Sequence, residues 1–458
     1  MPRSVPDHRV NLLREYFAQQ LEESAAEARD SFAARQNPNS SAYRHMEFDR
    51  VLAQARSLEP DKLEVLANHL VYGPPSHTAL VSSALAFLNP SLVPVADAVE
   101  QFAPRAADKI RDLALFIIAL DQTQQTDPVK AFREQSLKEI LSCWPSVVKW
   151  MAHFVRHASG SSGQEPNTIL PCTLLLTATC SGADTDPYRA EISSLSATSD
   201  LIYLLLCLTD PRTGLYWTIP SPKGPCRIAN LFAVMRQSEE GWITMGARLK
   251  CMHQSTRRSF FSALALRVRE LVSTTEDRQA MYGTVRSLAH LITGTLELGF
   301  EASLWGEIRR HTVRSLSSSL FDLGEKAETQ NIGNGRFWEC LAACIVSLVN
   351  ASVTEPSSTH TTCIARLIER GIYDVAAICL PHLMNAPEAN LVSALESMLP
   401  LFYLSRVGHA AVKQGQGDQA WTTSLQDHAS RKRNIASLTC EYEACMEVNR
   451  LLFAKRGA

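Results

Sequence analysis

The chain has 458 residues, which is long enough for one large helical body or for several domains. Apolar residues make up 45% and charged residues 20%, the balance of an ordinary globular protein, and the formal net charge of −2 argues against a nucleic-acid partner. The low aromatic content of 7%, with frequent Ala, Leu and Ser, favours packed helices over sheets.

The N-terminal stretch "MPRSVPDHRVNLLREYF" has no apolar core of a secretory signal and becomes amphipathic at once. The longest uncharged run, Asn167–Ala183, contains Pro171 and falls short of the ~20 predominantly apolar residues of a membrane helix. We therefore expect an intracellular protein, cytoplasmic or nuclear, that does not enter a membrane.

The first part of the chain reads as a series of short helices. Apolar residues at helical spacing between residues 10 and 25 predict the first, with Asp7 as its cap. Proline at the first helical position loses no helix hydrogen bond and has its φ angle preset, so prolines before apolar periodic runs predict further helix starts. These starts are Pro60, Pro104, Pro128 and Pro145.

Apolar spacing predicts most of the remaining chain to be helical as well. The predicted helices cover 191–208, 227–236, 257–271, 277–298, 303–321, 338–350, 361–370 and 390–403. "GLYWTIP", Gly214–Pro220, is the best candidate for an extended piece or short hairpin. The loop Ser159–Asn167 is flexible in composition, so the helical body could divide near 159–190.

So many short helices require a repeating architecture, because single hydrophobic cores stop growing beyond ~250–300 residues. In a stack of helical hairpins, each unit buries its apolar face against its neighbours. "CIARLIERGIYDVAAICLPHLM", Cys363–Met384, has a short helix, then Gly371, then a second apolar helix, and it resembles an armadillo-type repeat. We predict an all-α fold, an irregular armadillo/HEAT-like helical-repeat α-solenoid over residues 1–420.

Sequence motifs of common enzymes and metal sites are incomplete in this chain. Neither G-x-S-x-G nor H-E-x-x-H occurs. His153 and His157 have the spacing of two metal ligands on a helix, but no third ligand stands nearby, and we interpret them as a solvated polar face. Cys340 and Cys344 are also one turn apart, and core packing is the simpler interpretation. The twelve scattered cysteines predict free thiols rather than disulfides.

The last stretch, "LTCEYEACMEVNRLLFAKRGA", contains Cys440 and Cys445. With its lead-in "AWTTSLQDHASRKRNIAS", it resembles the entry into a MYND-type zinc finger, as found after long helical regions in many fungal proteins. In that resemblance Cys440 is the first ligand and Cys445 the second, and Phe453 and Lys455 stand in the spacer. The family implies two zinc ions held by seven cysteines and one histidine, in a protein-interaction module.

The stretch that follows Cys445 contains no further cysteine or histidine, so only the first knuckle of a truncated finger is resembled in residues 421–458. A structural zinc site requires four ligands. Leu438, Tyr442 and Val448 also recur at helical spacing with Cys445, and five residues of helix turn by about 500°. Cys440 and Cys445 would then point ~140° apart. We predict a helix that caps the stack and binds no structural zinc.

Two hypotheses for function follow. The first is an intracellular protein–protein interaction or scaffold protein, which binds a protein partner by surface complementarity in a groove of the solenoid. The alternative is an all-helical enzyme with a dispersed active site. A deep pocket of converging titratable groups would favour the enzyme, whereas a shallow groove on a helix stack would favour the binder.

Overall fold

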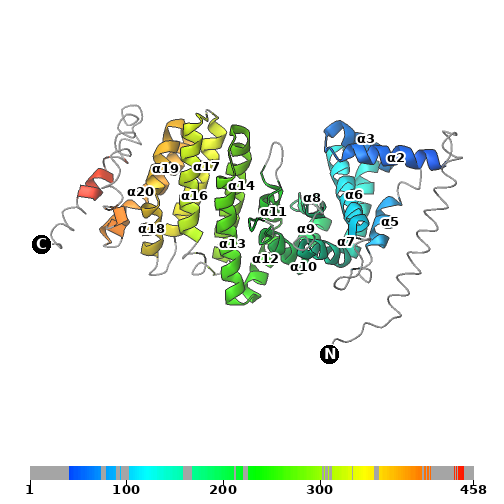
Figure 1. Cartoon of the computed structure of the whole chain (residues 1–458), viewed down its shortest axis with the longest axis horizontal. Helices are drawn as coiled ribbons and strands as arrows, with labels where there is room; N and C mark the ends of the chain where they lie inside the picture. Colours follow the sequence, from blue (N-terminus) through cyan, green and yellow to red (C-terminus); the bar gives the residue numbers. More distant parts are fainter. Residues whose placement is uncertain are drawn as a thin grey trace. The chain divides into compact units, whose positions relative to one another are not determined.

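The structure is a computed structural model, and it divides into two compact units. It describes residues 41–73, 79–88, 93, 103–157, 168–210, 213–219, 225–301, 304, 308, 312–332, 334–354, 360–404, 407–408, 410–411, 413, 438, 440 and 442–447. The first unit comprises Met1–Cys180 with Asp186–Ile192, and the second comprises Ser181–Thr185 with Ser193–Ala458 (Figure 1). The helix predicted between residues 10 and 25 and the 159–167 loop lie outside the described residues.

The first unit is built around helix α6 (Ala103–Gln122), which has a short, wholly apolar middle segment. Its helices are α2 (Ser41–Ala55), α3 (Pro60–Tyr72), α5 (Leu80–Phe87), α6 (Ala103–Gln122), α7 (Asp127–His157) and α8 (Ile169–Cys180), and α9 (Pro187–Ser194) starts in it. The segment Leu113–Ile117 of α6 is buried on every side, as expected for a helix that is hydrophobic all round. Accordingly, α6 packs against α3, α5, α7 and α8.

Proline marks a helix start at some of the predicted positions and not at others. Pro60 occupies the first turn of α3, as predicted. Pro145 does not start a helix, because it lies inside the continuous helix α7. An interior proline costs ~3 kcal/mol through a lost hydrogen bond and a clash. Trp144 and Trp150 are almost completely buried on either side of it, and packing of this face holds the helix together.

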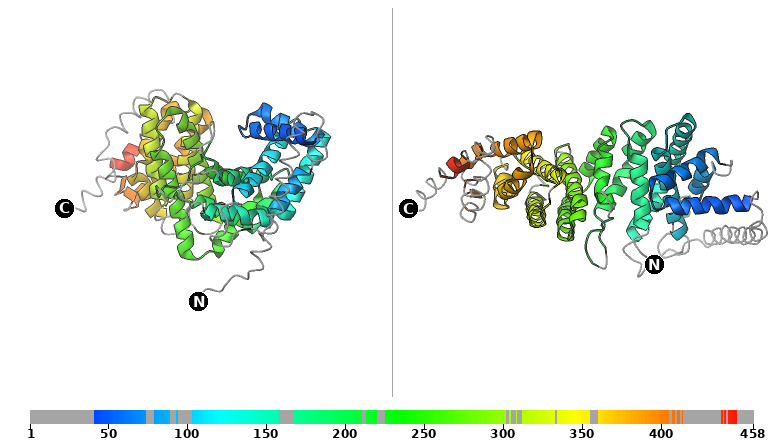
Figure 2. Two further views of the ribbon diagram at one scale, coloured as in Figure 1. Left: turned by 45° about the vertical axis from the view of Figure 1, so that its right-hand side comes forward. Right: turned by 90° about the horizontal axis from the view of Figure 1, so that it is seen from above.

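The second unit is a two-layer stack of helical hairpins. Its helices are α10 (Ser196–Leu206), α11 (Arg227–Met235), α12 (Glu239–Cys251), α13 (Gln254–Ser273), α14 (Arg278–Glu301), α16 (Thr312–Thr329), α17 (Gly335–Val353), α18 (His360–Glu369), α19 (Ile372–Cys379), η3 (Leu380–His382), α20 (Asn385–Glu396) and η4 (Leu399–Tyr403). One layer contains α10, α13, α16 and α19, each packed on the next, and the other contains α11, α14, α17 and α20 (Figures 1 and 2). The predicted all-α helical-repeat fold is confirmed.

The repeat proposed around Gly371 has the predicted form. Gly371 joins α18 to α19 with φ +73°, the left-handed region that favours glycine. A Cβ atom there would lie 2.8 Å from the Asp374 carboxylate and 3.3 Å from the Phe321 ring. Gly371 is therefore required both by its backbone conformation and by the closeness of the neighbouring side chains.

Several predicted boundaries were wrong. The helix predicted over 191–208 breaks at Leu195, whose extended backbone (φ −71°, ψ 131°) separates α9 from α10. Helix α12 was not predicted, because Gly241 and Gly246 weaken its helical signal. The side chain of Ser238 caps α12 by accepting a hydrogen bond from the Gly241 amide at 3.0 Å.

Two further predicted bounds were shifted, because the helix predicted over 303–321 is observed as α16 at Thr312–Thr329 and the one predicted over 390–403 as α20 and η4, whereas the others fall close to the observed elements. Helices predicted over 227–236, 257–271, 277–298, 338–350 and 361–370 correspond to α11, α13, α14, α17 and α18. The extended piece predicted at Gly214–Pro220 forms one antiparallel bridge, Thr209 to Tyr216, and the part of the chain that the structure describes contains no longer strand.

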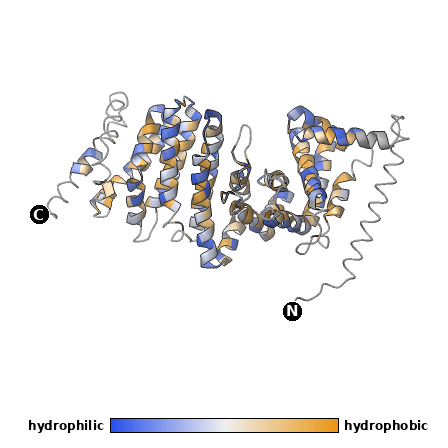
Figure 3. Cartoon of the chain, in the orientation of Figure 1, coloured by the Kyte–Doolittle hydropathy of each residue, from blue (hydrophilic) through white to orange (hydrophobic). Residues whose placement is uncertain are grey.

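Apolar residues gather on the packed sides of the helices (Figure 3). Helix α17 is the extreme case, because it is long and apolar enough by length and composition to cross a membrane. However, 56% of its apolar window is buried inside the protein, and it packs against α14, α16 and α20. Its place at the centre of the stack accounts for its composition.

Two helical glycines provide a matched test of this packing. An added Cβ at Gly294 of α14 would lie 2.7 Å from the Phe232 ring of α11, whereas one at Gly246 of α12 would meet no atom within 4 Å. We expect Gly294→Ala to lower the free energy of unfolding by ~1–3 kcal/mol through overpacking. We expect Gly246→Ala to raise it by ~0.5–1 kcal/mol through the lower helix propensity of glycine. Urea denaturation followed by circular dichroism measures both, and equal effects would contradict the close α11–α14 contact.

Candidate functional site

The two cysteines of the tail lie on different sides of a helical segment. Residues 438, 440 and 442–447 are helical, Cys440 is exposed, and Cys445 is buried. Tyr442 packs its ring 5.0 Å from that of Tyr373 and 5.9 Å from that of Phe402, measured between centroids. The described part of the tail therefore caps the last hairpin of the second unit, as the apolar spacing predicts.

The other candidate metal ligands are placed as their spacing predicts. His157 is exposed, its ring centroid is 4.1 Å from that of His153, and burial lowers the pKa of His153. Cys344 is buried, and that burial raises the pKa of its thiol strongly, whereas Cys340 is half-buried. Among the described residues, His, Cys, Asp and Glu form no group of three or more that could hold a metal ion.

A groove of about 770 Å³ lies between α13 and α16 in the second unit. Arg269, Val272 and Ser273 line it from α13, and the face of α16 lines it from the other side with Asp322, Glu325, Lys326, Glu328, Thr329 and the following Gln330. Because both helices belong to the same layer of the stack, their packing fixes the width of the groove.

Lys326 of α16 and Gln330, which directly follows α16, hold the C-terminal end of α13 in place. Lys326 donates from Nζ to the carbonyl oxygen of Val272 at 2.7 Å, and lies within 3.5 Å of those of Ser273 and Thr275. Gln330 donates from Nε2 to the carbonyl of Glu276 at 2.9 Å. These bonds satisfy carbonyls that the helix leaves open, and the cation also complements the negative end of the helix dipole.

The rest of the groove carries unpaired charge. Within the part of the chain that the structure describes, Asp322, Glu325 and Glu328 form no ion pair, and neither does Arg269. Partial burial raises the pKa of Asp322, and the nearby Lys326 opposes that shift. Asp322, Glu325 and Glu328 follow one another at intervals of three residues, so the three carboxylates spread over about 120° of the circumference of α16, with Lys326 in the same groove wall.

Sequence reasoning did not find this groove. The signal was acidic residues three apart in "DLGEKAE", which places Asp322, Glu325 and Glu328 on neighbouring turns. Such a pattern is common on solvated helix faces. Only the packing of α13 beside α16 turns it into one wall of a groove.

A fully buried cation lies on the same helix, α13. Arg267 donates from Nε to the Leu206 carbonyl at 3.1 Å, from Nη2 to the carbonyls of Leu205 (3.1 Å) and Leu208 (3.4 Å), and from Nη1 to that of Trp217. Its guanidinium carbon lies 5.2 Å from the centroid of the Tyr216 ring. Arg267 therefore joins the end of α10 to the segment 216–217, and burial lowers the pKa of its guanidinium.

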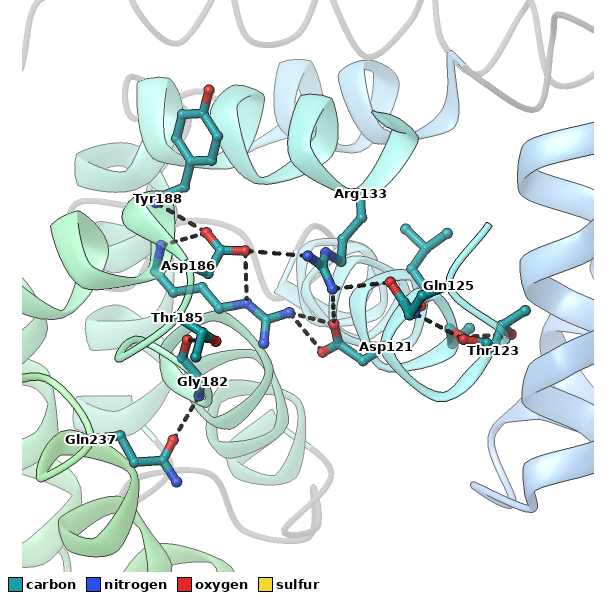
Figure 4. Close-up of polar contacts among 12 residues, drawn as sticks. Asp121, Thr123, Gln125, Arg133, Gly182, Thr185, Asp186, Tyr188 and Gln237 are labelled. Atoms are coloured by element: carbon teal, nitrogen blue, oxygen red, sulfur yellow. Dashed lines mark hydrogen bonds and ion pairs between the residues drawn. The ribbon is translucent and has the colours of Figure 1, made fainter. Parts of the chain in front are cut away.

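A separate charged network lies within the first unit (Figure 4). Arg189 donates from one nitrogen to both carboxylate oxygens of Asp121, at 2.6 and 2.7 Å. Arg133 lies 3.7 Å from Asp121 and 3.8 Å from Asp186, and donates to the side-chain oxygen of Gln125. Burial raises the pKa of Asp121, and the two arginines oppose the shift. With Asp186 accepting from backbone amides at the start of α9, the network fastens α9 to α6 and α7.

Comparison with known proteins does not assign this chain to a family. The chain matches no family model and no curated protein. Among solved structures it is similar to an engineered protein of the Northeast Structural Genomics Consortium, with 12% identity, a TM-score of 0.27, and coverage of 87% of this chain and 98% of that one. It is also similar to a circular tandem repeat protein with novel repeat topology, with 12% identity, a TM-score of 0.24, and coverage of 93% and 100%. At these TM-scores the likeness carries no argument.

Arg267 gives the sharpest stability test of this region. We expect Arg267→Met to lower the free energy of unfolding by about 3 kcal/mol or more, because it leaves several buried carbonyls without a donor. Arg258→Met on the exposed face of the same helix is the control and should change it by less than ~0.5 kcal/mol. Chemical denaturation measures both, and hydrogen exchange should show faster exchange at residues 208–219 in Arg267→Met alone. Equal behaviour of the two variants would show that Arg267 does not hold this segment.

Proposed function

We propose that the chain is a protein-interaction scaffold, active in the cytoplasm or nucleus, whose groove between α13 and α16 binds a segment of a partner protein. The observation that carries this proposal is the group of three carboxylates on α16, without an ion pair among the described residues, in the wall of a groove fixed by the packing of two helices. Helical-repeat stacks present extended surfaces of this kind, and binding requires no change in their shape.

The chemistry of the groove favours a basic segment. Asp322, Glu325 and Glu328 rise along α16 by about 4.5 Å per step, so their carboxylates extend over roughly 9 Å rather than meeting at one point. An elongated partner with Lys or Arg side chains suits this spacing better than a small molecule does. Arg269 at the opposite wall supplies one site for an acceptor of the partner.

A random dodecamer peptide library, panned on the full-length chain, tests this function. We expect enriched peptides with a net positive charge, and a fall in their affinity of about tenfold or more when the salt concentration is raised from 50 to 300 mM. The double variant Glu325→Lys/Glu328→Lys should abolish their binding in fluorescence anisotropy. The control Glu64→Lys/Glu134→Lys, with the same change in net charge on exposed residues of the first unit, should not.

Neutral or acidic peptides that bind both variants equally would contradict the assignment of the groove. A library that yields no enriched peptide would contradict the proposal as a whole. Circular dichroism of each variant confirms that a loss of binding is not a loss of folding.

The role of the tail is a second part of this proposal. We propose that the tail serves as a helical cap of the stack and holds no structural zinc in this chain. Its support is the exposure of Cys440 and the burial of Cys445 beside the Tyr442 contact, since one tetrahedral ion could not bind both thiolates without undocking the helix. The interaction role then belongs to the helical body.

Metal analysis of the purified full-length chain tests the role of the tail. We expect far less than one zinc per chain, with no difference between the wild type and the variants Cys440→Ser and Cys445→Ser. Zinc near one equivalent that is lost in either variant would refute the cap and support the truncated finger, through a site completed by other ligands.

A further inference from the structure

One ammonium group in the wall of the groove is already bound by the C-terminal end of α13. The Nζ atom of Lys326 lies 2.7, 3.5 and 3.4 Å from the carbonyl oxygens of Val272, Ser273 and Thr275. A helix leaves its last carbonyls without partners inside the helix, and its dipole makes this end negative. Three neighbouring carbonyl oxygens therefore match the three N–H donors of an ammonium group.

The carbonyls one turn earlier have donors of their own. The hydroxyl of Thr274 donates to the Glu270 carbonyl at 2.8 Å, and the hydroxyl of Thr275 donates to the Leu271 carbonyl at 2.6 Å. The helix end thus divides its carbonyls between local hydroxyls and the ammonium group of Lys326, which comes from another helix. Only the ammonium group can be exchanged for a group of the same chemistry from a ligand.

Lys326 has a second possible partner within reach. Asp322 lies one turn earlier on α16 and lines the same groove. Acidic and basic residues at this spacing commonly pair on a helix, yet these two described residues form no ion pair, and the lysine donates to the carbonyls instead. Rotation of the flexible lysine side chain would bring its ammonium group to the Asp322 carboxylate. Displaced from the carbonyls, Lys326 therefore still has a partner of opposite charge.

We infer that the carbonyl oxygens at the end of α13 form an ammonium subsite of the groove, and that Lys326 occupies it as an internal competitor of a lysine side chain of the partner segment. This inference rests on the proposed function. A lysine of the partner displaces Lys326 toward Asp322 and donates to the same three carbonyls. The contact of Lys326 is autoinhibitory, because the partner gains only the difference between its own hydrogen bonds and those that Lys326 gives up.

The subsite favours lysine over arginine. An ammonium group is a compact point charge with three donors, whereas the planar guanidinium group presents its donors as a fork that suits carboxylates. The carboxylates of α16 accept either side chain. The end of α13 is therefore the place in the groove where the two kinds of basic segment are distinguished.

Fluorescence anisotropy with the full-length chain and the selected basic peptides tests the competition. Lys326→Met keeps an unbranched side chain and removes the ammonium group, so we expect the affinity for a lysine-containing peptide to rise about fivefold or more. Arg269→Met removes one positive charge from the opposite wall of the same groove and is the matched control for charge alone. The same peptide with trimethyllysine keeps its charge but has no N–H donor, and it should gain no more in Lys326→Met than in Arg269→Met.

Chemical rescue tests the subsite without any peptide. Lys326→Ala removes the side chain beyond Cβ, and n-propylammonium has the missing atoms. We expect amide hydrogen exchange of residues 273–276 to become about fivefold or more faster in this variant, and to slow again when n-propylammonium chloride is added. Tetramethylammonium chloride carries the same charge without an N–H donor, and it should have no effect.

The outcomes separate this inference from the proposed function. Equal gains of affinity in Lys326→Met and Arg269→Met, an equal gain with the trimethyllysine peptide, or a loss of affinity in Lys326→Met would overturn the inference and leave the proposed function standing. If Glu325→Lys/Glu328→Lys binds the peptides like the wild type, the proposed function fails and the competition fails with it. Exchange that n-propylammonium does not slow would overturn the subsite whatever the peptides do. Circular dichroism of each variant confirms its folding.

Discussion

The second unit depends on one constraint: a single helical hairpin cannot bury its apolar stripe alone. Each hairpin meets this constraint by packing on the next, so α13 covers α16, which covers α19, while α14, α17 and α20 do the same in the other layer. The contact between Gly294 and the Phe232 ring shows how closely the layers are set, since even a methyl group would not fit. At the last hairpin that the structure describes, Tyr442 of the tail covers the rings of Tyr373 and Phe402.

The candidate binding surface is a by-product of the same stacking. Two helices packed side by side leave a groove between their exposed faces. The side chains that line it are those that are not buried in the core. On α16 these residues include three carboxylates and Lys326, and on α13 they are Arg269 and Ser273. Hydrogen bonds to backbone carbonyls hold the groove in shape, because Lys326 of α16 donates to the Val272 carbonyl at the end of α13.

Buried charges of the two units have structural roles. In the first unit, Asp121 and Arg189 compensate each other across α6 and α9, so their desolvation is offset by direct hydrogen bonds. In the second unit, Arg267 donates several hydrogen bonds to main-chain carbonyls. These bonds offset the free-energy cost of removing its charge from water. In both places the charge joins elements that are distant in sequence. Neither could be recognised from a local pattern.

The sequence by itself determined the helical class, most helix positions and the repeat unit around Gly371, because periodicity, capping and glycine conformation act within a few residues. Tertiary structure decided what depends on partners far along the chain. Burial of Trp144 and Trp150 carried α7 through Pro145, and α12 formed despite two glycines. The acidic residues of α16 form one wall of a groove only because α13 packs beside them. The free energies of packing and desolvation depend on which residues are neighbours in space. A single sequence shows whether each residue is polar or apolar, but it does not show which residues contact one another.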